Sequence, residues 1–253
     1  MTYKKALERI KREGLLATMR SVPQYLYRKY RRRQHRKMLA LPSLSERFSA
    51  IYTNNLWESA ESKSGLGSEI TFTLALRSWL VEAIPKLSIK TVVDAPCGDF
   101  NWIKELLPHT NVHYIGLDIV GSLIEENNKN FASDRIRFAT ADICSDTIPQ
   151  CDLLLIRDCL FHLSIADIDK VLRNLANTNY KYLLTSTHIN TSDFRNKDIV
   201  SGGFRRIDLF AHPFNFDEKH VIERVNDSPE GFAHPRQMVL FRKCHVPSAI
   251  AMT

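Results

Sequence analysis

The sequence predicts an α/β domain, with helices on both faces of a mostly parallel sheet, preceded by a basic helical segment. Two observations lead to this prediction. After residue 90, short aliphatic runs alternate with amphipathic stretches, which is typical of repeated strand–helix–strand units. Asp94, Asp118 and Asp142 each follow a strand-like run at intervals of 24 residues, about the length of one such unit.

Composition and cysteine content restrict the class of protein. The chain has 253 residues, of which 44% are hydrophobic and 25% charged, as expected for one ordinary globular domain with a sizeable core. Its five cysteines are odd in number and show no metal-binding spacing, which favours a reducing environment. No apolar run reaches the roughly 18–20 residues that span a bilayer. We therefore expect a cytoplasmic protein, with any membrane contact peripheral to the inner face of the membrane.

Residues 1–41 are expected to form a basic arm of one or two amphipathic helices. Residues 1–37 hold thirteen Lys or Arg against two Glu, a charge of +11, so the overall +7 leaves −4 for the remainder. An anionic partner is therefore expected at the arm. We favour an anionic membrane surface. RNA, on which Tyr25, Tyr27 and Tyr30 would stack, and a partner subunit remain open.

Residues 42–89 are expected to form a helical lid segment. Ser and Gly cluster here between two helical patterns. Trp57, Ser64 and Ser68 suit a polar lid over a bound ligand, and a flexible loop between helices is the alternative reading.

The domain itself is expected to span residues 90–253. Strands are predicted at 91–95, 114–119, 136–142, 152–158 and 181–187, with helices near 101–107, 121–131 and 165–176. Because parallel strands end at one edge of an open sheet, where ligands bind, the three aspartates should share a crevice there.

The ligand of this crevice is expected to be an adenosyl group. An acid after the second strand can accept both ribose hydroxyls, and one after the third can accept an adenine amino group. A dinucleotide is disfavoured, because the turn after the first strand has Pro96, which lacks an N–H, and only Gly98 for close approach to a pyrophosphate. S-adenosylmethionine fits better, since Asp94 can face its positive groups.

The motifs "VVDAPCGDF", "YIGLDIV", "ATADIC" and "DLLLIRDCLFHLS" resemble those of class I S-adenosylmethionine-dependent methyltransferases. The resemblance implies a Rossmann-like seven-stranded sheet whose last strand, residues 237–243, is antiparallel. With "NLWESAESKSGLGS", the pattern resembles a bacterial group associated with polysaccharide biosynthesis. The chain departs from the usual first motif, because Pro96 and Phe100 replace two of its glycines.

By matching positions, the resemblance implies specific contacts. Residues expected to bind the donor are Asp94, Ala95, Pro96, Gly98, Asp118, Ile119, Asp142, Ile143 and Arg157, with Trp57, Ser64 and Ser68 from the lid. His162 is expected to act as general base, with Asp158 as its orienting partner or as an alternative base. A purely structural role for His162 is the competing reading.

Acceptor contacts are expected from residues 188–217, an insertion after the fifth strand. Arg205, Arg206 and His188 would bind a sugar, an acidic sugar or a phosphate. Phenylalanines in this insertion would either line the acceptor pocket or belong to the core. The histidines and acids lack metal-ligand spacing, and no metal is expected.

The resulting hypothesis is a cytoplasmic bacterial methyltransferase that O-methylates a sugar or glycan intermediate, a lipid-linked one included, with S-adenosyl-L-homocysteine as product. Nucleic acid is a less favoured partner. The alternatives are an RNA methyltransferase that uses the basic arm, and a non-catalytic donor-binding scaffold.

Overall fold

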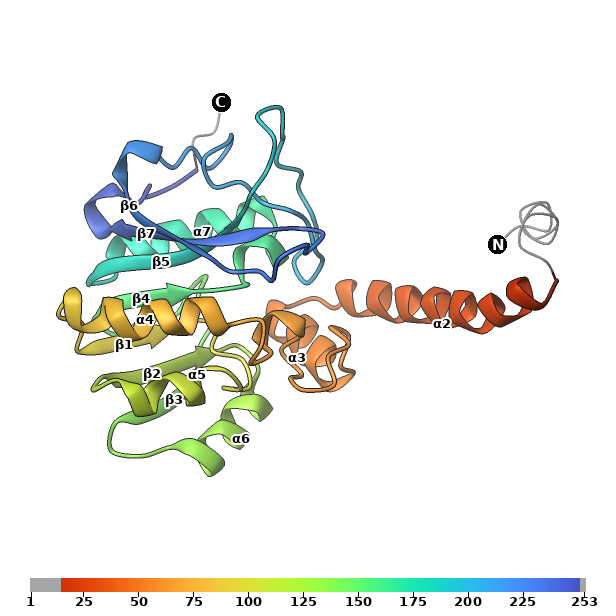
Figure 1. Cartoon of the computed structure of the whole chain (residues 1–253), viewed down its shortest axis with the longest axis horizontal. Helices are drawn as coiled ribbons and strands as arrows, with labels where there is room; N and C mark the ends of the chain where they lie inside the picture. Colours follow the sequence, from red (N-terminus) through yellow and green to blue (C-terminus); the bar gives the residue numbers. More distant parts are fainter. Residues whose placement is uncertain (1–14, 251–253) are drawn as a thin grey trace.

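The computed structural model describes residues 15–250, with side-chain surroundings from residue 25 onward. Figure 1 shows a body built around one sheet and a long helix, α2 (Leu15–Leu39), that projects from it. This helix is continuous through Pro23. Residues 1–14 of the predicted arm, including Lys4, Lys5, Arg9, Lys11 and Arg12, lie outside the described residues. No helix between residues 15 and 250 is both long and apolar enough to cross a membrane.

The body contains one seven-stranded sheet in the order β3-β2-β1-β4-β5-β7-β6. Strand β7 is antiparallel to both of its neighbours, and the other pairings are parallel. The strands are β1 (Thr91–Asp94), β2 (His113–Asp118), β3 (Ile136–Thr140), β4 (Cys151–Ile156), β5 (Tyr180–His188), β6 (Val221–Asn226) and β7 (Arg236–Arg242). The predicted Rossmann-like sheet with an antiparallel last strand is confirmed.

Helices cover both faces of the sheet (Figure 1). The longer ones after α2 are α3 (Leu44–Thr53), α4 (Leu74–Lys86), α6 (Gly121–Phe131) and α7 (Ile165–Asn177), with a short α5 (Ile103–Leu106). A side-chain cap at Ser164, which accepts the N–H of Asp167, starts α7 in the expected way.

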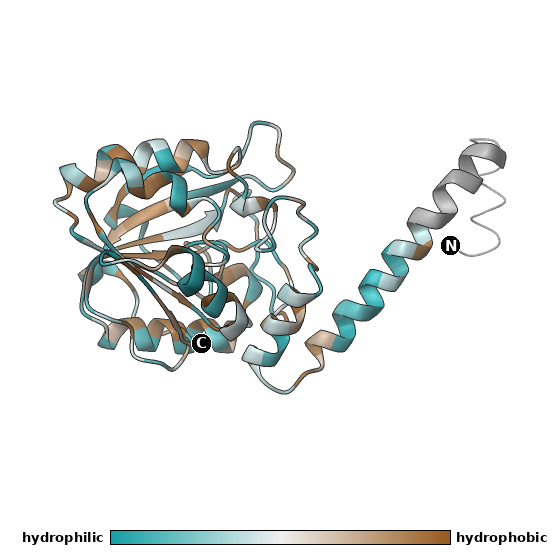
Figure 2. Cartoon of the chain, turned by 90° about the horizontal axis from the view of Figure 1, so that it is seen from below, coloured by the Kyte–Doolittle hydropathy of each residue, from teal (hydrophilic) through white to brown (hydrophobic). Residues whose placement is uncertain are grey.

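Central strands contribute side chains to two hydrophobic cores, one on each face of the sheet. In β4, Leu153 and Leu155 pack with α4, α5 and α6, whereas Leu154 and Ile156 pack with α7 and residues 207–216. Side chains alternate across a strand, and burial on both faces produces the continuous apolar run of β4. Figure 2 shows the hydrophobic residues gathered between helices and sheet.

Strand β6 was absent from the sequence prediction. Its residues alternate between partly exposed and exposed apart from Val225, and it pairs with β7 alone as an edge strand. An edge strand with charged residues lacks the apolar run that identified the central strands.

The strand order reverses between β1 and β4, because the chain moves from β1 to β2 and β3 and then returns to the other side. Crossovers on opposite faces leave an open crevice at the carboxyl ends of these two strands. The fold therefore places the turns after Asp94 and Ile156 side by side.

Candidate functional site

The turn after β1 is tied to the end of β2. Gly98 has a φ of +57°, which glycine adopts without steric cost, and its N–H donates to Oδ2 of Asp118 at 3.1 Å. The other oxygen of this carboxylate accepts the N–H of Val120 at 3.0 Å. The Cys97 N–H also donates to the Leu117 carbonyl at 2.8 Å. One carboxylate therefore fixes the turns that follow both strands.

Phe100 occupies a backbone conformation that favours glycine. Its φ is +59°, which costs a residue with a Cβ roughly 1–2 kcal/mol. The side chain is buried, and its ring lies 5.3, 5.1 and 5.0 Å from those of Tyr114, Phe131 and Phe138. Burial of an aromatic ring outweighs this cost. The turn therefore keeps the left-handed backbone that glycine usually adopts, although Phe100 stands at this position.

The three aspartates line a single cavity, as their spacing predicts. Asp94 is buried and accepts the Tyr114 hydroxyl at 2.8 Å. Asp142 accepts the N–H of Cys144 at 2.8 Å and is half-buried. Burial raises the pKa of Asp94 to about 7 and that of Asp118 to about 6, because an apolar surrounding disfavours the charged form. A cationic ligand would favour ionisation of both carboxyls.

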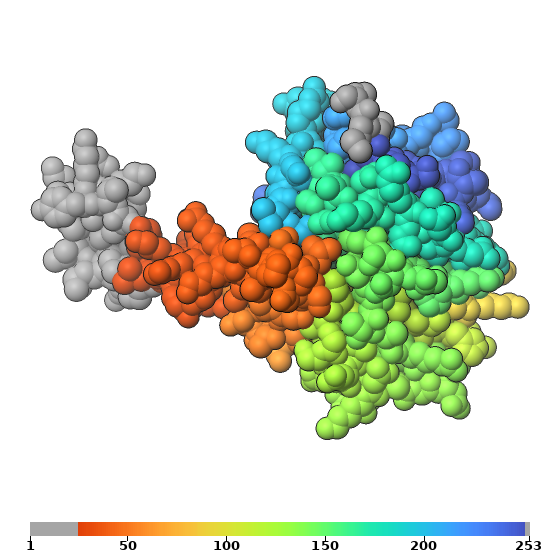
Figure 3. Space-filling model, turned by 180° about the vertical axis from the view of Figure 1, so that it is seen from behind, coloured from red at the N-terminus to blue at the C-terminus, as the bar shows by residue number. Residues whose placement is uncertain are grey.

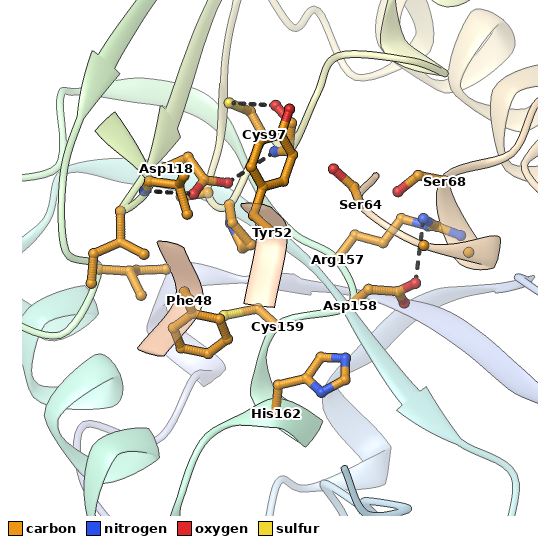
Figure 4. A pocket seen from close by; sticks show the side chains of 18 of the residues that line it. Phe48, Tyr52, Ser64, Ser68, Cys97, Asp118, Arg157, Asp158, Cys159 and His162 are labelled. Carbon is orange, nitrogen blue, oxygen red and sulfur yellow. Dashed lines mark hydrogen bonds and ion pairs between the residues drawn. The ribbon is translucent and has the colours of Figure 1, made fainter. Parts of the chain in front are cut away.

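The cavity has a volume of about 250 Å³ and is lined mainly by apolar side chains. Figure 4 shows Asp118, Tyr52 and Phe48 toward one end and Asp158 and His162 toward the other. All residues that were expected to contact the donor line it, namely Trp57, Ser64, Ser68, Asp94, Ala95, Pro96, Gly98, Asp118, Ile119, Asp142, Ile143 and Arg157.

The segment between α3 and α4 closes over the turn after β1. The Ser62 hydroxyl donates to the Asp99 carboxylate at 2.9 Å, and the Asp99 N–H donates to Oγ of Ser64 at 2.9 Å. The Asn101 amide donates to Oε1 of Glu61 at 2.6 Å. These contacts hold residues 59–68 in place over the cavity, in the position of the predicted lid.

Two glycines allow this close approach. A Cβ on Gly98 would lie 2.5 Å from Oγ of Ser64, and one on Gly67 would lie 2.1 Å from Oδ2 of Asp158. Neither distance is possible for real atoms without movement. The absence of a side chain at Gly98 and Gly67 therefore allows residues 59–68 to contact the turn after β1 at one end of the cavity and Asp158 at the other.

Four charged side chains, of which Arg157, Asp227 and Arg236 are buried and Asp158 is partly buried, form a network at the second end. Arg157 donates to Oδ1 of Asp227 through Nε and Nη2, at 3.0 and 2.9 Å. Nη1 of Arg236 lies 3.1 Å from Oδ2 of Asp158, and Nη1 of Arg157 lies 3.6 Å from the same oxygen. Nearby cations hold the pKa of Asp158 below its usual range despite burial. Two cations and two anions thus balance one another in a largely buried network.

Four atoms of this network have no hydrogen-bond partner within residues 15–250. Oδ2 of Asp227 and Nε of Arg236 lie 3.5 Å apart as an ion pair, whereas Oδ1 of Asp158 and Nη2 of Arg236 are buried atoms of residues that line the cavity. A buried polar group without a partner costs about 1–3 kcal/mol. An acceptor and a donor are therefore available to the polar groups of a ligand.

His162 lies at the same end with a defined tautomer. Its Nδ1 is 2.6 Å from the carbonyl of Gly203, and because a carbonyl only accepts, Nδ1 carries the proton and Nε2 of the neutral ring is free to accept one. Burial lowers the pKa of His162, so the ring is neutral near pH 7. The arrangement suits a general base.

Residues 92–178 match the family described as a methyltransferase domain. No curated protein sequence matches the chain.

Solved structures with this fold include three methyltransferases of low sequence identity. The N-methyltransferase NodS from Bradyrhizobium japonicum WM9, in complex with S-adenosyl-l-homocysteine, is 14% identical, with a TM-score of 0.54 over 76% of this chain and 97% of that one. Magnesium protoporphyrin IX methyltransferase from Synechocystis PCC 6803, with bound S-adenosyl-l-homocysteine, is 14% identical, with a TM-score of 0.51 over 69% and 83%. Human N-acetylserotonin methyltransferase is 16% identical, with a TM-score of 0.51 over 77% and 58%. The chain thus spans little more than half the length of the human enzyme.

The three residues expected to bind an acceptor do not line the cavity. Arg205 is buried and donates to the Leu163 carbonyl, Arg206 is exposed and lies over the Phe194 ring, and His188 is buried and accepts the Ile207 N–H at 3.2 Å. Arg205 thus ties the insertion to the loop before α7, Arg206 packs on a ring of the insertion and His188 holds its backbone, and a role for these three residues in acceptor binding stays a prediction.

Some phenylalanines of the insertion belong to the core and one lines the cavity. Phe214 and Phe216 are buried in the core and Phe210 packs against it, whereas Phe204 lines the cavity and is 51% exposed. Periodicity alone does not separate the two groups, since the insertion has no regular repeat.

The sequence prediction missed several residues that line the cavity or support it. Leu44, Phe48 and Tyr52 lie on α3, far from the motifs in the sequence, and Arg236 starts β7. Asp227, which pairs with Arg157, follows the unpredicted strand β6. Residues 42–89 were expected to be largely helical, but the sequence does not show which surface each helix covers. No group of three or more His, Cys, Asp or Glu in the described residues could hold a metal ion.

Substitution of Phe100 separates backbone strain from packing. We expect Phe100→Ala to lower the free energy of unfolding by about 3–5 kcal/mol through the lost ring, and Phe100→Gly to lower it by about 1 kcal/mol less, because glycine tolerates the positive φ. Urea unfolding of both variants measures the difference. An alanine variant as stable as the glycine variant would contradict the left-handed backbone at this position.

The raised pKa of Asp94 makes its contribution to stability depend on pH. The folded protein keeps this proton up to about pH 7, whereas an unfolded aspartate releases it near pH 4. Between these values the folded state binds more protons, so the contribution falls as pH rises. We expect Asp94→Asn to gain a few kcal/mol relative to the wild type between pH 4.5 and 7.5, measured by urea unfolding. A difference that is independent of pH would contradict the burial of an ionisable group here.

Proposed function

We propose that the protein transfers a methyl group from S-adenosylmethionine to a hydroxyl group of a sugar or glycan intermediate in polysaccharide biosynthesis. S-adenosylmethionine is the cofactor of this methyltransferase. The domain match supports this, as do neighbours of the same fold whose structures contain S-adenosylmethionine or S-adenosyl-l-homocysteine.

The residues at the Asp118 end of the cavity fit the donor. Asp94 and Asp118 offer carboxylates in an apolar surrounding, where their attraction for the amine and sulfonium and their acceptance of ribose hydroxyls are strengthened. Ile119 and Ile143 supply apolar walls for the adenine. When bound, the donor supplies an electrophilic methyl group.

The residues at the other end fit an acceptor that must lose a proton. His162 holds an unprotonated Nε2, fixed by its bond to Gly203, and the ring lies 5.7 Å from that of Trp57 and 4.6 Å from that of Phe161. An aligned hydroxyl would lose its proton to Nε2 during the transfer. Oδ2 of Asp158 remains paired with Arg236, and Asp158 lowers the cost of the positive charge that forms on the imidazole.

The observation that supports a sugar as the methyl acceptor is the pair of unpartnered atoms near His162, one a hydrogen-bond acceptor and one a donor. Oδ1 of Asp158 can accept from one hydroxyl and Nη2 of Arg236 can donate to the next, which is the polarity of neighbouring hydroxyls on a pyranose ring. Trp57, Phe161 and Phe204 offer aromatic faces around the same space. A neutral acceptor with several hydroxyls satisfies both buried atoms at once.

The direct experiment supplies purified protein and S-adenosylmethionine to glycan and lipid extracts from cells that lack the gene. Formation of S-adenosyl-l-homocysteine only when extract is present, with a product heavier by one methyl substitution, is the expected result. A non-catalytic scaffold would bind the donor and form no product with any extract.

His162→Ala tests the general base. We expect donor affinity by calorimetry to stay unchanged and turnover to fall about 10²- to 10⁴-fold, the range of general-base catalysis. His109→Ala, at an exposed histidine outside the cavity, is the matched control. Wild-type turnover in the His162 variant would remove this residue from the mechanism.

Arg236→Lys tests recognition of the acceptor. Lysine keeps the charge beside Asp158 but loses the second guanidinium nitrogen, so we expect KM for the acceptor to rise about five- to tenfold, as for one lost hydrogen bond. Donor affinity should stay the same. A fall in donor affinity with no change in acceptor KM would place Arg236 in the donor site instead.

A further inference from the structure

The described half of α2, residues 25–39, presents a surface that carries cations and no anions. Leu15–Leu39 contains no acidic residue. Six cations of this half are exposed: Arg28, Lys29, Arg32, Arg33, Arg36 and Lys37. A helix of this composition has no charge partner of its own and is complementary to an anionic surface.

Apolar and aromatic side chains are interleaved with these cations. Tyr25 is 39% exposed, Leu26 56%, Tyr27 54% and Tyr30 58%. With 3.6 residues per turn, Leu26, Lys29, Tyr30 and Arg33 fall on the side of α2 away from the body. Long cationic stems and amphipathic tyrosines next to a leucine are typical of helices that lie in a membrane interface.

The opposite side of α2 is fixed to the body. Arg31 donates to the carbonyls of Asn54 and Asn55 at 3.1 and 2.5 Å and pairs with Glu58 at 2.9 Å. Nε2 of His35 lies 2.9 Å from the carbonyl of Gly202. Figure 3 shows α2 projecting beside the residues near 200. The direction of α2 is therefore set by polar contacts on two separate segments.

These contacts relate α2 to the mouth of the cavity. The helix projects from the side where the parallel strands end and where α3 lies (Figure 1), and α3 lines the cavity through Leu44, Phe48 and Tyr52. Leu66 and Phe204 also line the cavity, and each is about half exposed. A surface that contacts α2 would therefore lie close to the entrance.

The loop that anchors α2 also orients the catalytic histidine. His35 binds the carbonyl of Gly202, and the next carbonyl, that of Gly203, accepts from His162. A Cβ on Gly202 would lie 2.9 Å from Cδ2 of Leu39. The helix and the acceptor end of the cavity thus share one rigid connection.

We propose that the outward face of α2 docks onto an anionic lipid bilayer and holds the cavity entrance near that surface. Each Lys or Arg near such a surface contributes about 1 kcal/mol, and the exposed leucine and tyrosines enter the interface. This interleaving favours lipid over RNA, because phosphate contacts alone would not need Leu26. The proposal goes beyond the proposed function and does not depend on which group is methylated.

The test uses the full chain and vesicles of phosphatidylcholine with or without phosphatidylglycerol. Lys29, Arg32, Arg33 and Arg36 are changed together to Gln, which preserves helix propensity. We expect the wild type to sediment with the anionic vesicles at low salt and the variant, which lacks four charges, to bind roughly a thousandfold less tightly. High salt should weaken wild-type binding.

A matched variant controls for total charge. Lys86, Lys90, Lys129 and Arg137 are exposed on the body, and their combined change to Gln removes the same charge while leaving α2 intact. This variant should bind anionic vesicles nearly as the wild type does. Equal losses in both variants would overturn the proposal, as would wild-type binding to single-stranded RNA but not to vesicles. Donor affinity by calorimetry should be unchanged in all variants, so a failure of docking is distinct from a failure of the proposed function.

Discussion

The carboxylate of Asp118 holds together the two turns on which the site is built. One oxygen accepts the N–H of Gly98 after β1, and the other accepts that of Val120 after β2. The parallel pairing of these strands brings the turns to one edge, but the hydrogen bonds set their shape. Because the carboxylate is buried, each bond is strengthened by the low local dielectric, and its loss would leave a buried polar group unpaired.

Burial of charge recurs throughout the cavity and gives its two ends different chemistry. At the Asp118 end, Asp94 and Asp118 have raised pKa values, and a cation would favour their ionised forms. At the other end, Asp158 is paired with Arg236 and its pKa is lowered, while His162 stays neutral. A site of this kind favours a positively charged donor at one end and a neutral, proton-bearing acceptor at the other.

The segments before the sheet turn this open edge into an enclosed site. Helix α3 lines the cavity through Phe48 and Tyr52, and the segment between α3 and α4 contacts the turn after β1 through Ser62 and Ser64. Helix α2 continues outward from the same group of contacts. Its link to the loop that holds His162 connects the surface proposed to meet a membrane with the His162 end of the cavity.

The sequence by itself determined the order of the central strands and helices and the common edge of Asp94, Asp118 and Asp142, because buried strands need apolar runs and parallel strands end together. It also singled out His162 and the turn after β1, which line the cavity, since each lies within a motif that is continuous in the chain. Only the tertiary structure decided that Arg236 and not Arg205 faces the cavity, and that Asp227 pairs with Arg157. These contacts join segments about 70 residues or more apart, and their pairing depends on how the irregular insertion and the edge strand β6 pack, which no local periodicity specifies.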